Sequence, residues 1–243
     1  YLIHNGSEKI NKLIFVGTPH IGSPNAFKTL IAGDNFGVPF LEPKEIKKLA
    51  KDMSSVYQLL PSKQYFQNFG GYFFDGLNEA DNYDSTISFL TDQGSNSNLV
   101  NKAEIFHSDQ MDNFVAPNNL PTYNIVGCNT PTVGKIIHRK FFVGDDIFGI
   151  NYVEKDDYSL ETVIGDGTVP FNSAMAINNV NTYFVSGANH AKMPSQDGIR
   201  QLITKLIIDS DEPLSSNIQT SNENCHLNSW KIISFHSPVN PHV

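Results

Sequence analysis

The chain has 243 residues, of which 40% are hydrophobic and 17% charged, and this composition excludes a disordered or fibrous protein. Seventeen Lys and Arg residues against 25 Asp and Glu residues give a net charge of −8, which disfavours a nucleic-acid partner because phosphate backbones attract basic surfaces. No apolar run approaches the roughly 20 residues that a membrane-spanning helix needs.

The first residues of the chain have the pattern of a helix end. Tyr1, Leu2 and Ile3 resemble the last turn of a helix, and Asn5-Gly6 supplies the left-handed stop that commonly follows one. We therefore expect the rest of this helix to lie upstream of Tyr1.

A strand, a glycine-containing loop and a helix follow. Leu13–Val16 is apolar at successive positions, which is typical of a parallel strand covered on both faces. The loop Gly17–Pro24 comes next, and Ala26–Ile31 predicts a helix. This order is the repeating unit of an α/β sheet.

Residues 37–120 predict an insertion of short helices among aromatic and polar loops. The predicted helices cover Pro43–Leu60, Ser85–Leu90 and Asn98–His107. We interpret a cluster of aromatic side chains as core and lid packing rather than as a binding site. Its members are Tyr57, Tyr65, Phe66, Phe69, Tyr72, Phe73 and Phe74.

Strand patterns resume after this insertion. Thr122–Gly127 and Asn181–Val185 predict two core strands. Between them, Lys135–Val143 and Ile147–Val153 predict a hairpin that turns at Gly144-Asp145-Asp146.

The main domain is expected to close with a helix. This helix opens at Pro194, a favoured first-turn residue, and its apolar residues recur at helical spacing. We place the main domain at residues 1–211. Residues 212–228, rich in Ser and Asn, predict a polar linker, and residues 229–243 predict the start of a β-rich accessory domain.

The cysteines and nearby histidines indicate no cofactor site. Cys128 and Cys225 lie far apart, which fits neither a disulfide-rich scaffold nor a Cys-x-x-Cys site and leaves the redox compartment open. Cys225-His226 with His236 and His242 matches no tight metal-ligand spacing. We therefore expect neither a metal nor another cofactor.

Two polar loops carry the candidate catalytic residues. Asp166 lies in Gly-Asp-Gly-Thr-Val-Pro after one strand region, and His190 ends Gly-Ala-Asn-His after the next. An acid followed by a histidine gives the second and third members of a Ser, Asp, His constellation. Alone, each residue also fits a turn or a capping position, but their order and placement favour catalysis. We predict that Asp166 orients His190 and that His190 shuttles the proton.

Four segments resemble the lecithin:cholesterol acyltransferase and phospholipid:diacylglycerol acyltransferase family of α/β hydrolases. They are Gly17–Pro24, Ser54–Ser62, Gly165–Pro170 and Gly187–Ser195, and they stand in the family's order. The resemblance extends over residues 1–208. It implies the C-terminal part of an α/β-hydrolase fold, a parallel sheet with flanking helices, with a cap at about residues 37–120.

The same resemblance assigns roles and partners. It implies that Asp166 is the catalytic acid and His190 the catalytic base, and that the substrate is a lipid or another acyl ester. It allows peripheral contact with a membrane surface. Localisation stays open, with a secreted or cell-surface protein allowed, and no residue is assigned to substrate binding.

The chain departs from the family at the nucleophile. No serine has glycines two positions before and two positions after it, as a nucleophile elbow requires. In the family the elbow precedes the helix whose last turn we read at Tyr1, so we expect the serine and the oxyanion-hole loop upstream. The strand Leu13–Val16 should then lack a partner on one edge, and this chain alone should be inactive.

Other serines and histidines fit structural roles better. Ser23 is followed by Pro24, which has no N–H to offer an oxyanion. Ser173 fits a cap for the helix-like Ala174–Ile177. His20 ends a core strand and is expected to stabilise its loop rather than to catalyse.

The sequence thus predicts a lipid O-acyltransferase or a lipase-type ester hydrolase with a Ser–Asp–His mechanism. One alternative is a non-catalytic binding module that kept the fold and lost the serine. Another is a carboxylesterase or thioesterase that acts on smaller substrates. The choice of water or an alcohol as acyl acceptor depends on water exclusion rather than on the triad.

Overall fold

A computed structural model describes residues 9–35, 38–76, 80–112, 114–117, 119–144 and 152–227. Its helices are α2 (Pro24–Ile31), α3 (Pro43–Ala50), α4 (Ser54–Gln58), α5 (Lys63–Phe69), α6 (Tyr83–Asp92), α7 (Ser97–Phe106), the π-helix η2 (His107–Met111), α8 (Phe171–Ala174), the 3-10 helix η3 (His190–Ser195) and α9 (Asp197–Ile208). Its strands are β1 (Leu13–Val16), β2 (Phe73–Asp75), β3 (Thr122–Cys128), β4 (Thr130–Gly144), β5 (Tyr152–Gly165), β6 (Asn181–Ser186) and β7 (Ile218–Gln219).

The first sheet has the strand order β1-β3-β6-β7. β1 and β6 run parallel to β3, with Leu13 opposite Thr122 and Tyr123 opposite Asn181, whereas β7 is antiparallel to β6. Parallel strands flanked by helices confirm the predicted α/β fold class, and the predicted strands at β1, β3 and β6 are confirmed within one residue. Within the described residues, β1 pairs with β3 alone.

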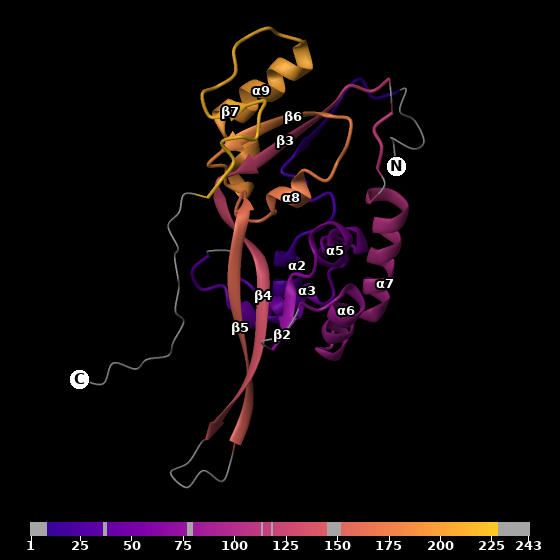
Figure 1. Cartoon of the computed structure of the whole chain (residues 1–243), viewed down its shortest axis with the longest axis vertical. Helices are drawn as coiled ribbons and strands as arrows, with labels where there is room; N and C mark the ends of the chain where they lie inside the picture. Colours follow the sequence, from indigo (N-terminus) through magenta and orange to yellow (C-terminus); the bar gives the residue numbers. More distant parts are fainter. Residues whose placement is uncertain are drawn as a thin grey trace, which may run out of the picture.

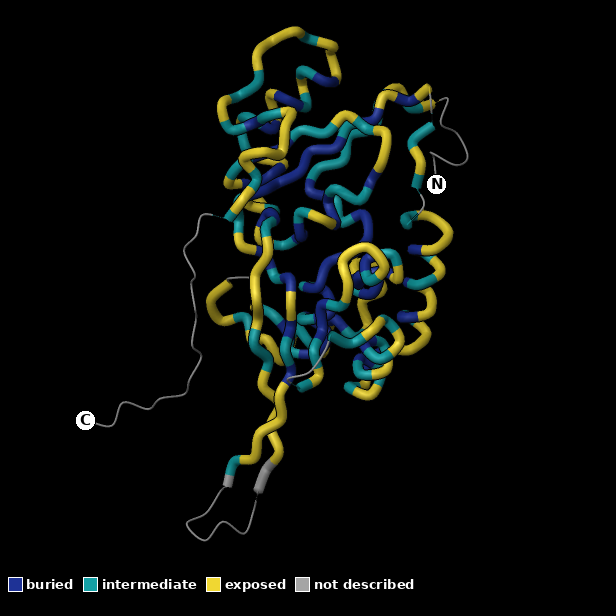
Figure 2. The backbone as a smooth tube through the Cα atoms, in the orientation of Figure 1, coloured by how far each residue is buried: buried dark blue, intermediate teal, exposed yellow. Residues whose placement is uncertain are grey.

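The second sheet has the order β2-β4-β5 and is dominated by a long hairpin. β4 and β5 are antiparallel and pair from Thr130 with Gly165 out to Gly144 with Tyr152. The hairpin is confirmed, but its second strand runs on to Gly165 rather than ending at Val153. Most of the predicted turn lies outside the described residues. Figure 1 shows the hairpin extending well beyond the helices, and Figure 2 shows that its far end is exposed.

The inserted helices pack beside this hairpin (Figure 1). The predicted helix Pro43–Leu60 is two helices, α3 and α4, because Met53 adopts an extended backbone before the weak helix formers Ser54 and Ser55. α5 and β2 were not predicted. Ring contacts such as Tyr65 with Tyr72 at 5.8 Å confirm the predicted packing for most of the aromatic cluster, whereas Phe69 is 43% exposed and lines a groove together with Tyr65.

The last helix begins three residues later than predicted. Pro194 lies inside η3, and Gln196 is extended, so that α9 starts at Asp197. One face of α9 packs on the first sheet through Ile199, Leu202 and Leu206. The described helices include none long and apolar enough to cross a membrane.

Residues 212–228, expected to form a linker, are attached to the first sheet at two points. β7 pairs with β6, and Cys225 forms a disulfide with Cys128 at the end of β3, with their Cα atoms 5.4 Å apart. The sequence did not predict this disulfide. The proposed accessory segment 229–243 lies outside the described residues.

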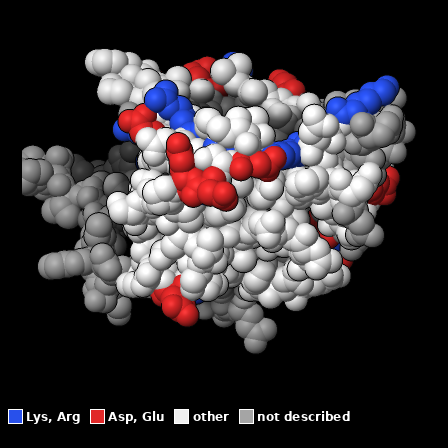
Figure 3. Space-filling model, turned by 90° about the horizontal axis from the view of Figure 1, so that it is seen from above, with Lys and Arg blue, Asp and Glu red and all other residues white. Residues whose placement is uncertain are grey.

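Seen from the α9 end, the surface is largely uncharged (Figure 3). Acidic and basic side chains occur there in small separate groups, and this face shows no extended basic patch in its described part. A phosphate backbone would therefore find little electrostatic attraction on this face.

Candidate active site

The predicted acid and base lie next to each other at the ends of two strands. Asp166 directly follows β5, and His190 begins η3 after β6. The Nδ1 atom of His190 lies 2.8 Å from Oδ2 of Asp166. The backbone N–H of His190 also donates to the carbonyl oxygen of Asp166, at 2.8 Å. Asp166 and His190 are therefore held together by both a side-chain and a backbone hydrogen bond.

The carboxylate of Asp166 is buried, with 1% of the residue exposed, and both of its oxygens are occupied. Oδ1 accepts hydrogen bonds from the backbone N–H groups of Thr168 at 3.0 Å and Val169 at 2.7 Å. Oδ2 faces His190. The turn thus holds the carboxylate in one orientation, as short polar side chains commonly do with the residues that follow them.

The imidazole of His190 is oriented for proton transfer. A carboxylate only accepts, so Nδ1 carries the proton of this hydrogen bond and Nε2 has the free lone pair. The side chain is 35% exposed, and Nε2 makes no hydrogen bond within the described part of the chain. The hydrogen bond to Asp166 raises the pKa of His190 above its ordinary 6.5, against the opposite effect of burial. Such an imidazole can accept a proton at Nε2.

Two glycines let the neighbouring strands approach this pair, and sequence reasoning missed both. A Cβ on Gly17 would lie 3.1 Å from Oδ2 of Asp166 and 3.2 Å from Nδ1 of His190. A Cβ on Gly127 would lie 2.6 Å from the Cβ of Asp166. Gly17 also has a φ of +58°, which favours glycine. Their positions at the carboxyl ends of β1 and β3 are the signal that could have identified them.

Hydroxyl groups anchor the loop that carries Asp166. Thr132 accepts from the backbone N–H of Gly167 at 2.8 Å, and Ser23 donates to the carbonyl oxygen of Thr168 at 2.7 Å. Ser23 is buried and also caps α2, as expected for a structural serine. Ser173 does not cap a helix as predicted. It lies within α8, and its hydroxyl donates to Gly22, because α8 begins earlier than expected.

His20 belongs to the loop that follows β1 rather than to the pair. The ring is buried, makes an edge contact with Phe15, and places Nε2 3.5 Å from the side-chain oxygen of Asn124. Burial lowers the pKa of His20 to about 4, so the ring is neutral at pH 7. These are the contacts of a packed loop residue.

Metal-ligating side chains do not cluster in the described part of the chain. No group of three or more His, Cys, Asp or Glu residues there is placed to hold a metal ion. Cys225 is in a disulfide and offers no thiolate, and His236 and His242 lie outside the described residues.

A family model described as lecithin:cholesterol acyltransferase matches residues 5–130, over half of the 243 residues. The match includes β1, the Gly17–Pro24 loop, the inserted helices and β3, and it ends before Asp166 and His190. A search of curated proteins found no match to the chain. The family match indicates acyltransferase or esterase activity of a lipase-like kind, with lipid substrates. The chain belongs to the lecithin:cholesterol acyltransferase family.

Proposed function

We propose that Asp166 and His190 are the acid and base of a Ser–Asp–His triad that transfers acyl groups from lipid esters. The hydrogen bond of 2.8 Å between His190 Nδ1 and Asp166 Oδ2 carries this proposal. Family membership supplies the substrate class. Within the described residues no serine hydroxyl is hydrogen-bonded to His190, and we propose that the serine lies upstream of Tyr1, where the resemblance places it.

The chemistry follows from the orientation of His190. As the serine oxygen attacks the ester carbonyl, its proton passes to Nε2, and the buried carboxylate of Asp166 stabilises the imidazolium. The same proton then goes to the departing alcohol, which leaves an acyl-enzyme. Water or a second alcohol then loses a proton to Nε2 and takes the acyl group, and the same proton returns to the serine oxygen as the acyl–serine bond breaks. Hydrolysis and acyl transfer therefore share these residues.

An apolar groove beside the acid loop supports a lipid substrate. Its volume is about 430 Å³, and its walls come from α5, the base of the β4–β5 hairpin and the start of α8. Asp166 and His190 do not themselves line this groove, but Ile164 and Pro170, which flank Asp166 in sequence, do. The other apolar lining residues include Tyr65, Phe69, Val163 and Phe171, and the polar ones are Lys135 and Asn172. A hydrocarbon chain fits such a surface better than a polar substrate does.

Ester turnover by the protein extended upstream of Tyr1, so that it includes the proposed serine, tests the proposal. Asp166→Asn removes the charge that orients His190, and His190→Ala removes the base, so each should lower kcat by about 10⁴-fold. Asp157→Asn, an exposed carboxylate on β5, serves as the matched control and should leave the rate unchanged. Unchanged turnover in both site variants would end the proposal.

The pH profile adds a readout that a merely structural role would not change. His190 acts as a base only when neutral, and its pKa is raised in the free protein, so kcat/KM should fall as pH drops through a value above 6.5. In Asp166→Asn the acidic limb of the pH profile should shift to lower pH, because the charge and the hydrogen bond that raise the pKa of His190 are gone. A limb at the same pH in both proteins would contradict the assigned partner.

Two further measurements distinguish this proposal from a non-catalytic binding module and from an esterase or thioesterase that acts on smaller substrates. A serine-directed phosphonate should label the intact protein and should fail to label His190→Ala, whereas a binding module would not be labelled at all. Long-chain esters should outcompete short-chain ones, whereas a carboxylesterase or thioesterase would prefer the short chains.

A further inference from the structure

A separate pocket lies inside the insertion, within residues 57–112. It has a volume of about 160 Å³ and is enclosed by α4, α5, α6, α7 and η2. Neither Asp166 nor His190 lines it. A cavity of about 150 Å³ holds a molecule the size of benzene, so this pocket is suited to a small ligand.

The pocket has an apolar side. Its aliphatic and aromatic walls are formed by Tyr57, Leu60, Pro61, Ile87, Val100 and Ala103. Tyr57 uses its hydroxyl elsewhere, since it donates to the carbonyl oxygen of Lys51 and accepts from the backbone N–H of Asn96. This side therefore offers a ligand only hydrocarbon contacts.

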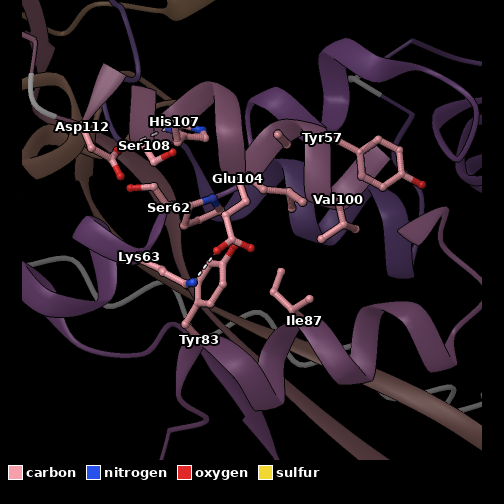
Figure 4. Close-up of a pocket in the computed structure, with 13 residues that line it drawn as sticks. Tyr57, Ser62, Lys63, Tyr83, Ile87, Val100, Glu104, His107, Ser108 and Asp112 are labelled. Carbon is pink, nitrogen blue, oxygen red and sulfur yellow. Dashed lines mark hydrogen bonds and ion pairs between the residues drawn. The ribbon is translucent and has the colours of Figure 1, made fainter. Parts of the chain in front are cut away.

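The opposite end is polar, as Figure 4 shows for Ser62, His107 and Asp112. The Ser62 hydroxyl, Nδ1 of His107 and Oδ1 of Asp112 are all buried, and none of these atoms has a hydrogen-bond partner. Ser62 and His107 are each only 4% exposed. Buried polar atoms are nearly always bonded to protein, water or ligand, so three unpartnered atoms around one cavity call for an occupant.

The hydrogen bonds of His107 define what that occupant must supply. Its Nε2 lies 2.9 Å from the carbonyl oxygen of Gln58, which can only accept, so Nε2 carries a proton. When Nε2 carries the only ring proton, Nδ1 is an acceptor that faces another acceptor, Oδ1 of Asp112, at 3.4 Å; a second proton, on Nδ1, would make the two residues an ion pair. The hydroxyl of Ser62 makes no hydrogen bond to His107, so the three residues are not arranged as a second hydrolytic triad.

The charges at the pocket favour a cation. Lys63 and Glu104 line it and form an ion pair with each other, so among the lining residues Asp112 is the carboxylate without a lysine partner, and it pairs with His107 only if that ring carries a second proton. An ammonium group presents three N–H donors, one for each of the three unpartnered atoms. We infer that this pocket binds a small primary amine, with its ammonium group at Ser62, His107 and Asp112 and its short apolar body against Val100 and Ile87.

A matched series of small molecules tests this inference on the intact protein without substitution. Benzylamine, benzyl alcohol and toluene share one apolar body, and calorimetry or NMR titration at pH 7 measures the affinity of each. Benzylamine should bind at least about tenfold more tightly than benzyl alcohol, because a hydrogen bond to a charged group contributes more than a neutral one. Equal affinities, or no binding of benzylamine, would overturn the inference.

Variants then locate the site. Asp112→Asn keeps the shape and removes the charge, so it should weaken benzylamine at least about tenfold and change benzyl alcohol little. Asp92→Asn, an exposed carboxylate on α6 that does not line the pocket, is the control and should bind normally. Crystals soaked with benzylamine that hold only water in this pocket would also contradict the inference.

The outcome is independent of the ester chemistry proposed above. His190→Ala should bind benzylamine as tightly as the unsubstituted protein, because His190 does not line the pocket. If the protein binds benzylamine but does not turn over esters, the proposed function fails and this inference stands. If it turns over esters but does not bind benzylamine, the reverse holds.

Discussion

Asp166 and His190 owe their geometry to residues that carry no chemistry of their own. Oδ1 of Asp166 is held by two backbone N–H groups, and the same backbone joins the acid loop to the base through the His190 N–H. Gly17 lies against both side chains, and a methyl group there would come within 3.1 Å of Asp166 and 3.2 Å of His190, closer than ordinary van der Waals contact. At the scale of the residue, the site thus depends on close approach of main chain to a charged pair.

A methyl group at Gly17 should disturb this pair. In Gly17→Ala the new Cβ would lie 3.2 Å from Nδ1 of His190, in a backbone with φ +58°, so we expect at least a tenfold loss of kcat and a loss of about 1 kcal/mol in stability. Turnover and the free energy of unfolding in urea measure the two effects.

Gly76→Ala is the matched control for this substitution. Gly76 also has a positive φ, +95°, but a Cβ there would meet nothing within 4 Å. It should lose similar stability and keep full activity. Equal losses of activity in both variants would show that backbone strain, not contact with His190, is responsible.

Sequence reasoning singled out Asp166 and His190, whose side chains lie 2.8 Å apart in the structure, because each lies in a short turn motif directly after a strand pattern. It missed Gly17 and Gly127 as members of the site because their importance depends on which strands are neighbours in space. It also gave Ser173 the wrong partner, since the true one, the carbonyl oxygen of Gly22, is 151 residues away in the chain.

At the scale of the element, the buried side chain of His138 links the β4–β5 hairpin to β2, in addition to the backbone pairing of β2 with β4. His138 is fully buried on β4, with Nδ1 2.7 Å from Asp75 and Nε2 2.9 Å from Asp156. It therefore links all three strands of the second sheet. The rings of Phe89 and Tyr158 pack against it at centroid distances of 5.0 Å and 5.1 Å.

Replacing His138 should loosen this sheet. His138→Leu fills a similar volume but leaves two carboxylates facing a hydrocarbon, so we expect a loss of about 2 kcal/mol in the free energy of unfolding. Arg139→Gln, at the exposed next position on β4, should change stability little. A His138→Leu protein as stable as the parent would show that the contacts of His138 with the two carboxylates do not stabilise the sheet.

The lengths of the elements were less predictable than their order. The apolar spacing of α6, α7 and α9 placed these helices within a few residues. The second hairpin strand was underestimated because its missed part, residues 154–165, is mostly exposed, with Leu160 at 42% and Val163 at 37%, and so lacks the regular alternation that marks a buried face. The division between α3 and α4 depends on one extended residue, Met53, which no hydrophobic pattern reveals.

At the scale of the whole molecule, one disulfide ties the C-terminal segment to the first sheet. Cys128 ends β3, and Cys225 lies 97 residues later, beyond α9 and β7. Two cysteines so far apart fit no spacing pattern, which is why this bond could not be predicted from the sequence. The fold brings them together by returning the chain along β6 through β7.

Removing the disulfide should destabilise the protein. Cys225→Ser reopens a long loop in the unfolded chain, so the free energy of unfolding should fall by about 2–4 kcal/mol. Urea unfolding under oxidising conditions measures this loss, and the unsubstituted protein in reductant should unfold like the variant. Identical unfolding with and without reductant would contradict the predicted contribution.

This bond also changes what a cut in the chain would do. A protease that cleaves an exposed loop between Cys128 and Cys225 would leave both products joined, so that the nicked protein still migrates as one band on a non-reducing gel. The two fragments would separate only after a thiol is added. The two halves of the candidate site, contributed by the loops at Asp166 and His190, would stay in one covalent molecule even after such damage.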